Sequence, residues 1–153
     1  DNSGGYLSTV TDMASLFLNK SKIIYQLDTK GIVEQIYSKT NTSRSYDIIV
    51  LTNQNSASAS EILAAALQES YGAKIVGTNS FGKGTVQKAY QLESGALVKY
   101  TVQKWLTPDG NWINEKGVTP DVEVELDTEY YKNPSDEADN QLQTAIKELV
   151  DVK

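Results

Sequence analysis

Residues 47–69 read DIIVLTNQNSASASEILAAALQE and place a buried strand directly before a helix. The first six residues, from Asp47 to Thr52, form a short apolar run typical of a strand inside a parallel sheet. The alanine-rich residues from Ala59 to Glu69 have the composition of a helix. We therefore expect a strand-turn-helix unit whose polar turn contains Ser58.

The rest of the chain is expected to alternate helices with hairpins and strands. Apolar spacing predicts further helices at 5–19 and 136–150, and β-type runs predict strands at 23–27, 32–37, 74–77, 86–92 and 96–106. Turn residues separate these runs, as in Thr107-Pro108-Asp109-Gly110. With 153 residues, 39% of them hydrophobic, the chain has the length of one domain. The fold class is predicted to be α/β with a mixed sheet.

The composition excludes several classes of function. The net charge is −6 and the basic residues are scattered, which argues against a nucleic-acid surface. The chain contains neither histidine nor cysteine, so a Ser-His-Asp triad, a Cys-His dyad and almost every type of zinc site are absent. A covalent catalyst of this composition would need a lysine, a carboxylate or an amino terminus as its base.

The turn around Ser58 is a candidate nucleophile position. A side chain at the start of a helix lies beside free backbone N–H groups, which stabilise a developing negative charge. This segment taken alone favours the structural alternative: Ser58 followed three residues later by Glu61 is a capping box, which holds a helix terminus together without any catalysis. The two interpretations can both be true.

The second candidate segment is the glycine-rich loop from Gly77 to Thr85, which contains Lys83. It nearly matches the phosphate-binding pattern of Gly, four residues, Gly, Lys and Ser/Thr. However, Gly84 stands where the hydroxyl residue belongs, and the following residues predict a strand rather than a helix. Nucleotide binding is therefore disfavoured, and Lys83 is either a base between two glycines or a solvated loop charge.

A lysine base requires a particular environment. The ordinary lysine pKa near 10.4 leaves only about 0.04% of the side chain neutral at pH 7. Full burial can lower the pKa of a lysine by up to about 3 to 5 pH units. If Lys83 is a base, we expect dry, apolar surroundings for its amine.

Taken together, the two segments resemble the C-terminal processing, or tail-specific, protease family. The resemblance rests on Ser56-Ala57-Ser58-Ala59-Ser60-Glu61 and Phe81-Gly82-Lys83-Gly84, and it extends in order to Asp1-Asn2-Ser3-Gly4-Gly5, Thr107-Pro108-Asp109-Gly110 and Gly117-Val118-Thr119-Pro120-Asp121. It implies a crotonase-like, Clp-protease-like αβ superhelix. It also implies Ser58 as nucleophile, Lys83 as base and Gln87 as the third catalytic residue, with oxyanion donors from Ala59 and from Gly4 or Gly5.

The resemblance also carries expectations about the whole protein. It implies a peptidase core at 1–126 without the family's first strand and PDZ domain, a helical extension of the same domain at 127–153, and a PDZ domain upstream. Ser3 departs from the family's usual proline. Polypeptide substrates are implied, a homo-oligomer is left open, and no metal or organic cofactor is implied. The implied location is the bacterial cell envelope or the extracellular space, with a membrane anchor in a missing N-terminal segment as one option. The alternative function is a noncatalytic peptide-binding or scaffold member of the same fold.

Overall fold

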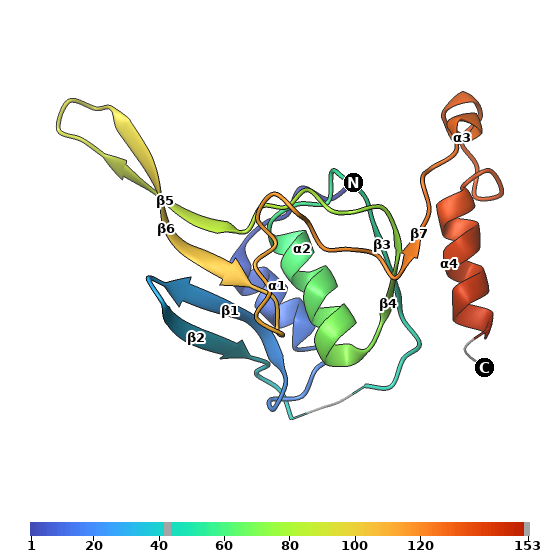
Figure 1. The fold of residues 1–153 in the computed structure, drawn as a ribbon, viewed down its shortest axis with the longest axis horizontal. Coiled ribbons are helices and arrows are strands. Elements are labelled where there is room, and N and C mark those ends of the chain that lie inside the picture. The colour runs from blue at the N-terminus through green and yellow to red at the C-terminus, as the bar shows by residue number, and fades with distance from the viewer. Residues whose placement is uncertain (42–43, 152–153) are drawn as a thin grey trace.

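The computed structural model describes residues 1–41 and 44–151, arranged as two small sheets with the first helices between them and the last helices on the outer side of one sheet (Figure 1). In chain order the elements are α1 (Leu7–Ala14), β1 (Ile23–Thr29), β2 (Ile32–Tyr37), β3 (Ile49–Thr52), α2 (Ala59–Ala65), the π-helical turn η1 (Ala66–Tyr71), β4 (Lys74–Gly77), β5 (Thr85–Gln91), β6 (Leu97–Leu106), β7 (Val122–Glu123), α3 (Thr128–Lys132) and α4 (Asn140–Asp151).

The strands form one antiparallel and one parallel sheet. The antiparallel sheet has the order β2-β1-β6-β5, and the parallel sheet has the order β3-β4-β7. The β5–β6 hairpin extends well beyond the helices, as the yellow-green arm in Figure 1 shows. Near its base the pairing skips a residue: Val86 pairs with Gln103 but Gln87 pairs with Thr101, so Val102 is the extra residue of a β-bulge.

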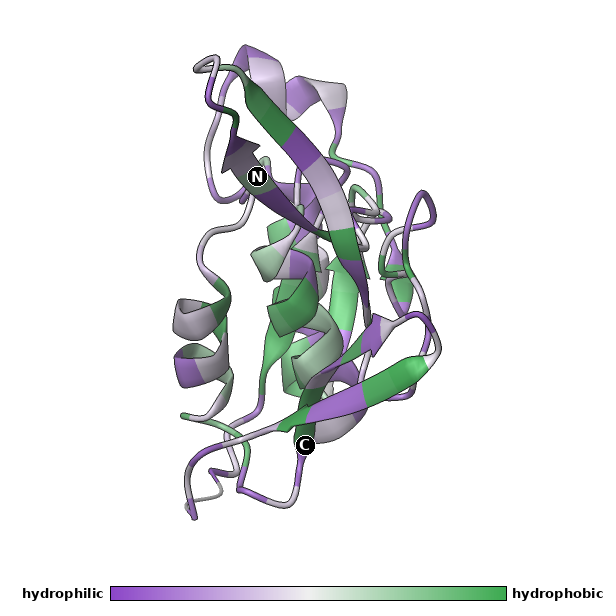
Figure 2. Ribbon diagram, turned by 90° about the vertical axis from the view of Figure 1, so that its left-hand side faces the viewer, coloured by the Kyte–Doolittle hydropathy of each residue, from purple (hydrophilic) through white to green (hydrophobic). Residues whose placement is uncertain are grey.

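The core forms where the helices meet the sheets. α2 contacts α1 and β1, and η1 contacts β4. Figure 2 shows apolar residues concentrated on these central elements. The buried cluster includes Val10 and Ala14 of α1, Ile24 and Tyr25 of β1, Ala59 and Ile62 of α2, Ile75 of β4 and Trp105 of β6. This packing fixes the start of α2, and with it Ser58, relative to both sheets.

The α/β class predicted from the sequence is confirmed, and so are the strands of both hairpins. The sequence predicted a mixed sheet, whereas the parallel strands and the antiparallel strands lie in two separate sheets. The first helix is shorter than predicted, spanning Leu7–Ala14, and the helix predicted at 59–69 continues from α2 into η1, which ends at Gly72 with φ 90°. The sequence analysis missed β7 and α3, which are two and five residues long and carry too little periodicity to be recognised.

The C-terminal segment packs against the parallel sheet. α4 contacts β3 and β4, and the Gln141 amide donates to the Val124 carbonyl at 2.7 Å. Lys74 of β4 pairs with Glu148 of α4 at 2.7 Å. Residues 152–153 of the predicted 127–153 extension lie outside the described residues.

Tyr25 gives the fold an expected sensitivity to alkali. Burial raises the pKa of its hydroxyl above the ordinary value of 10.0, although a hydrogen bond with Thr11 opposes this effect. The unfolded chain therefore releases this proton at a lower pH than the folded chain. The stability contributed by Tyr25 is complete below about pH 10 and is lost as the pH rises through the higher folded-state value. In thermal melts followed by circular dichroism, Tyr25→Phe should flatten the fall in Tm above pH 10.

Tyr6→Phe is the matched control, because Tyr6 is 81% exposed and its surroundings change little on unfolding. Its melting curves should follow the wild-type dependence on pH. A Tyr25→Phe protein with the wild-type slope above pH 10 would contradict the prediction.

Candidate active site

Ser58 occupies a strained backbone position between β3 and α2. Its φ of 61° and ψ of −120° lie outside the regions that residues with a side chain ordinarily adopt. Such strain costs about 1–3 kcal/mol and is concentrated at functional sites. A serine held on a sharp turn from a strand into a helix presents its hydroxyl outward, as nucleophilic serines do on other folds.

The capping box predicted for Ser58 and Glu61 is present, and its hydrogen bonds run through the Glu61 carboxylate and the Ser58 backbone. The Ser58 N–H donates to the Glu61 carboxylate at 2.7 Å, and the Glu61 N–H donates to the Ser58 carbonyl at 3.0 Å. The Ser58 side chain makes no cap hydrogen bond. Its hydroxyl is therefore free for chemistry while Glu61 holds the turn.

Glu61 also holds the lysine loop. Its fully buried carboxylate accepts the Gly82 N–H at 2.7 Å and the Lys83 N–H at 2.9 Å. It accepts the Ser80 hydroxyl at 2.6 Å as well. One side chain therefore joins the backbone of the candidate nucleophile to the backbone of the candidate base.

The glycines on either side of Lys83 are required by close packing. A Cβ on Gly82 would lie 2.9 Å from the Gly117 nitrogen, and one on Gly84 would lie 2.7 Å from the Asn114 nitrogen. The loop is thus pressed against the 113–117 turn. Thr85 then begins β5, so the loop leads into a strand and offers no helix N-terminus to a phosphate.

A cavity of about 230 Å³ brings the predicted catalytic side chains together. We call it the Ser58 cavity. Its lining consists of Leu7, Ser58, Ile62, Lys83, Thr85, Val86, Gln87, Lys99 and Trp105. α2 contributes Ile62, the glycine-rich loop contributes Lys83, and β5 contributes Gln87. The lining combines four apolar side chains with three polar ones and two lysines.

The expected dry environment of Lys83 is not present in the described chain. Lys83 is exposed, because its loop lies at the surface and the Ser58 cavity is open to solvent. Among the described residues its side chain makes neither an ion pair nor a hydrogen bond, and only its backbone is fixed, through Glu61 and through the Trp105 indole N–H at 2.6 Å. Gln87 is also exposed.

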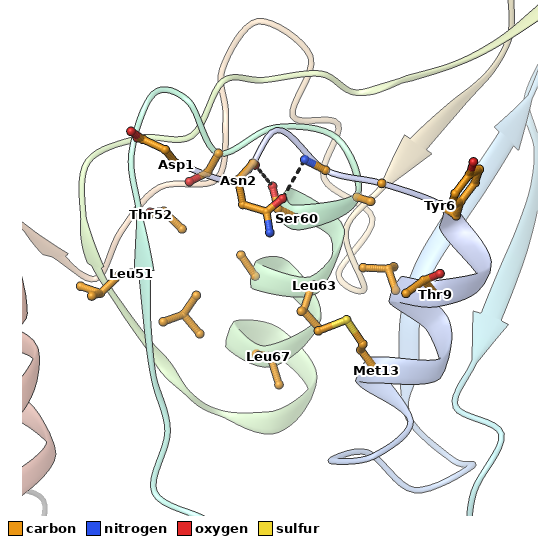
Figure 3. Close-up of a pocket in the computed structure, with 17 residues that line it drawn as sticks. Asp1, Asn2, Tyr6, Thr9, Met13, Leu51, Thr52, Ser60, Leu63 and Leu67 are labelled. Carbon is orange, nitrogen blue, oxygen red and sulfur yellow. Dashed lines mark hydrogen bonds between the residues drawn. The ribbon is translucent and has the colours of Figure 1, made fainter.

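The first residues of the chain lie against the nucleophile turn. The Ser60 hydroxyl donates to the Asn2 carbonyl at 2.6 Å, and the Gly4 N–H donates to the Asn2 side chain at 2.9 Å (Figure 3). Gly4 has a φ of +100°, and a Cβ there would lie only 3.0 Å from the Ser58 Cβ. Only glycine fits so close to the turn.

The same contacts distinguish the predicted oxyanion donors. The Gly4 N–H is already bonded to Asn2, whereas the N–H groups of Gly5 and Ala59 donate to no acceptor within the described residues. Gly5 and Ala59 are therefore the free donors beside the Ser58 turn.

A larger cavity of about 370 Å³ lies between α1, α2 and β3. Figure 3 shows Met13, Leu63 and Leu67 among the side chains on its walls. Its lining includes Gly4, Gly5 and Ala59 but none of the three predicted catalytic side chains. The predicted catalytic side chains therefore line the smaller Ser58 cavity, whereas the predicted oxyanion donors line the larger one.

Sequence reasoning missed two parts of the site. It interpreted Glu61 only as a capping residue, since nothing local indicates that its carboxylate also reaches a loop some twenty residues away. It placed Lys99 on one face of the 96–106 strand together with Thr101, but did not identify it as a site residue.

The described residues offer neither a membrane-spanning helix nor a metal-binding cluster. Within 1–41 and 44–151, no helix combines the length and the apolar character needed to cross a bilayer. The same residues contain no group of three or more acidic side chains placed to hold a metal ion.

Comparison with known sequences identifies related proteins. The sequence model of peptidase family S41 matches residues 1–124. The carboxy-terminal processing protease CtpA of Bacillus subtilis (strain 168) is 43% identical over 139 residues, which cover 90% of this chain and 30% of that protein. A probable CtpA-like serine protease of Staphylococcus aureus (strain N315) is 40% identical, over 87% of this chain and 27% of that protein. The chain thus spans less than a third of the length of these relatives.

Solved structures give the same grouping. The photosystem II D1 C-terminal processing protease matches with a TM-score of 0.74 and 34% identity, over 81% of this chain and 32% of that chain. A putative S41 protease from Bacteroides fragilis NCTC 9343 matches with a TM-score of 0.73 and 16% identity, over 99% of this chain and 43% of that chain. At 16% identity the second match supports the fold alone.

Proposed function

Because the chain belongs to peptidase family S41, we propose that it is the serine endopeptidase core of a C-terminal processing protease, with Ser58 as nucleophile and Lys83 as general base. One observation carries this proposal: a serine with strained backbone angles shares a cavity with a lysine and a glutamine. No histidine is present to take the place of the lysine.

The proposed reaction follows from these positions. The Ser58 hydroxyl attacks the carbonyl carbon of a peptide bond while neutral Lys83 takes its proton. The C–N bond then breaks, and Lys83 gives the proton to the departing amine. In the second half of the reaction water attacks the acyl-serine while Lys83 takes its proton. The ester C–O bond then breaks, the new C-terminal carboxyl group leaves, and Lys83 returns the proton to the Ser58 oxygen. The N–H groups of Gly5 and Ala59 stabilise the oxyanion, and Gln87 orients the Lys83 amine.

Because Lys83 is exposed, we expect the substrate itself to shield its amine from water. A polypeptide lying in the Ser58 cavity would displace water from the lysine amine, and this desolvation favours the neutral form that a base requires. The remainder of a longer protein could cover the cavity in the same way. On this view a bound polypeptide raises the reactivity that the open site already has toward a small electrophile.

The wider proposal follows the relatives. We propose unstructured or C-terminally tagged polypeptides as substrates, recognised with the help of a PDZ domain outside this chain. The proposed location is the bacterial cell envelope or the extracellular space. Homo-oligomerisation is compatible with this function but is not needed for the chemistry.

The test is covalent labelling with a small fluorophosphonate, which reacts with activated serines and needs no recognition domain. Intact-mass measurement should show one phosphonyl adduct per chain, and peptide mapping should place it on Ser58. The Ser58→Ala protein should remain unlabelled. Labelling at another serine, or none in the wild-type protein while it is folded, would count against the proposal.

A further inference from the structure

Lys99 introduces a second cation into the Ser58 cavity. It lies on β6 and pairs across the hairpin with Ala89 of β5. Two residues further along β6 lies Thr101, which pairs with Gln87. Side chains two positions apart on a strand point to the same face, so Lys99 lies on the face that carries Gln87. The lining of the cavity, which contains both side chains, agrees with this placement.

The charge of Lys99 is not paired with an acidic side chain among the described residues. The residues that line the Ser58 cavity include two lysines and no Asp or Glu. Among the described residues Lys99 takes part in no ion pair or hydrogen bond, whereas Lys39, Lys74 and Lys132 each pair with an acidic side chain. The cavity therefore combines a net positive charge with an apolar wall formed by Leu7, Ile62 and Trp105.

The neighbourhood of Lys99 leaves room for a ligand. Ala89, its partner on β5, has a side chain of a single carbon. The volume of about 230 Å³ is below the ~300–1,000 Å³ usual for small-molecule sites, so only one or two residues of a polypeptide fit. An anion bound to Lys99 must therefore lie close to the carbonyl that Ser58 attacks.

We propose that Lys99 recognises a carboxylate of the substrate next to the cleaved bond, a subsite that rests on the proposed peptidase function and makes it more specific. The carboxylate comes either from an acidic side chain or from the C-terminus of the polypeptide. Lys83 serves as the base, and Lys99 holds the anion in place. The site thus divides two tasks between two lysines.

The test measures binding to the Ser58→Ala protein, so that cleavage does not interfere. Isothermal titration compares short peptides blocked at both ends, identical except for Glu or Gln at one position, with that position moved along the peptide. A third peptide has Gln and a free C-terminal carboxylate. At one position the peptide with the carboxylate should bind about fivefold more tightly. The favoured peptide identifies the source of the carboxylate.

Variants of Lys99 establish whether it is responsible. Lys99→Gln should abolish the preference, and Lys99→Arg should retain it. Lys88→Gln is the matched control, since Lys88 lies on the same hairpin but pairs with Tyr100 on the opposite face. Equal affinity for all peptides, a preference that survives Lys99→Gln, or no saturable binding would overturn the inference. A Lys99-dependent preference in a protein whose Ser58 does not label would instead reject the peptidase function and leave a peptide-binding module.

Discussion

Lys83→Met should slow the fluorophosphonate labelling of Ser58 by about 10²–10⁴-fold, the usual contribution of a general base. Met keeps the length and apolar stem of lysine but cannot accept a proton. The fold should tolerate the change, because the Lys83 side chain is exposed and only its backbone is hydrogen-bonded. The measurement is the labelling rate as a function of pH, with circular dichroism to confirm folding.

Two variants separate base catalysis from simple charge. Lys83→Arg keeps the positive charge, but a guanidinium does not lose its proton in proteins, so it should be as slow as Lys83→Met. Lys88→Met, on the same strand, should label at the wild-type rate. Lys83→Met and Lys83→Arg should both remain slow at every pH at which the protein is folded. A Lys83→Arg protein that labels at more than a third of the wild-type rate would rule out the general-base role.

Glu61→Gln should both destabilise the protein and slow labelling. Each carboxylate oxygen of Glu61 accepts two hydrogen bonds: one from the Ser80 hydroxyl and the Gly82 N–H, the other from the N–H groups of Ser58 and Lys83. An amide in this fully buried position turns its NH₂ group either toward the N–H groups of Ser58 and Lys83 or toward the Gly82 N–H, where the Ser80 hydroxyl can rotate and accept. At least one buried donor is therefore left unpaired, which costs about 1–3 kcal/mol and corresponds to a fall in Tm of roughly 2–12 °C.

The loss of activity should exceed the loss of folded protein. Once the two loops are no longer held to one carboxylate, the position of Ser58 relative to Lys83 is no longer fixed. Misplacement by about 1 Å can slow a reaction by about 10²-fold. The labelling rate should therefore fall by about that factor at a temperature where the variant remains folded. Glu69→Gln is the control, because its carboxylate accepts a single exposed backbone N–H, that of Asp109. If Glu61→Gln melted and labelled like Glu69→Gln, Glu61 would not position the site.

The sequence was most informative where local chemistry determines structure. Its apolar run and alanine-rich stretch predicted β3 and α2, and turn residues delimited both hairpins. Lys74–Gly77 was predicted with the boundaries of β4, since a buried run between polar residues leaves little freedom. The segments that carry Ser58, Lys83 and Gln87 were identified in the same way, although their catalytic roles are still predictions.

Features that depend on contacts distant in sequence were not predictable. The Gly82 and Lys83 N–H groups donate hydrogen bonds to Glu61 only once the two loops have met. The close packing of Gly84 against Asn114 depends on the folded chain in the same way. The choice of Gly5 over Gly4 as a free donor depends on one hydrogen bond from Gly4 to Asn2. The exposure of Lys83 could not be predicted because burial is a property of the assembled surface.

The bulge at Val102 limits how the length of this chain can vary. Because side chains alternate along a strand, one residue gained or lost between Lys99 and the bulge would turn Lys99 away from Gln87 and bring a neighbour into its place. Insertions or deletions at the hairpin tip, around Gly95, do not change the face of β6 on which Lys99 lies. Natural relatives should therefore differ in length at the tip of the hairpin and keep a constant number of residues between Lys99 and the bulge.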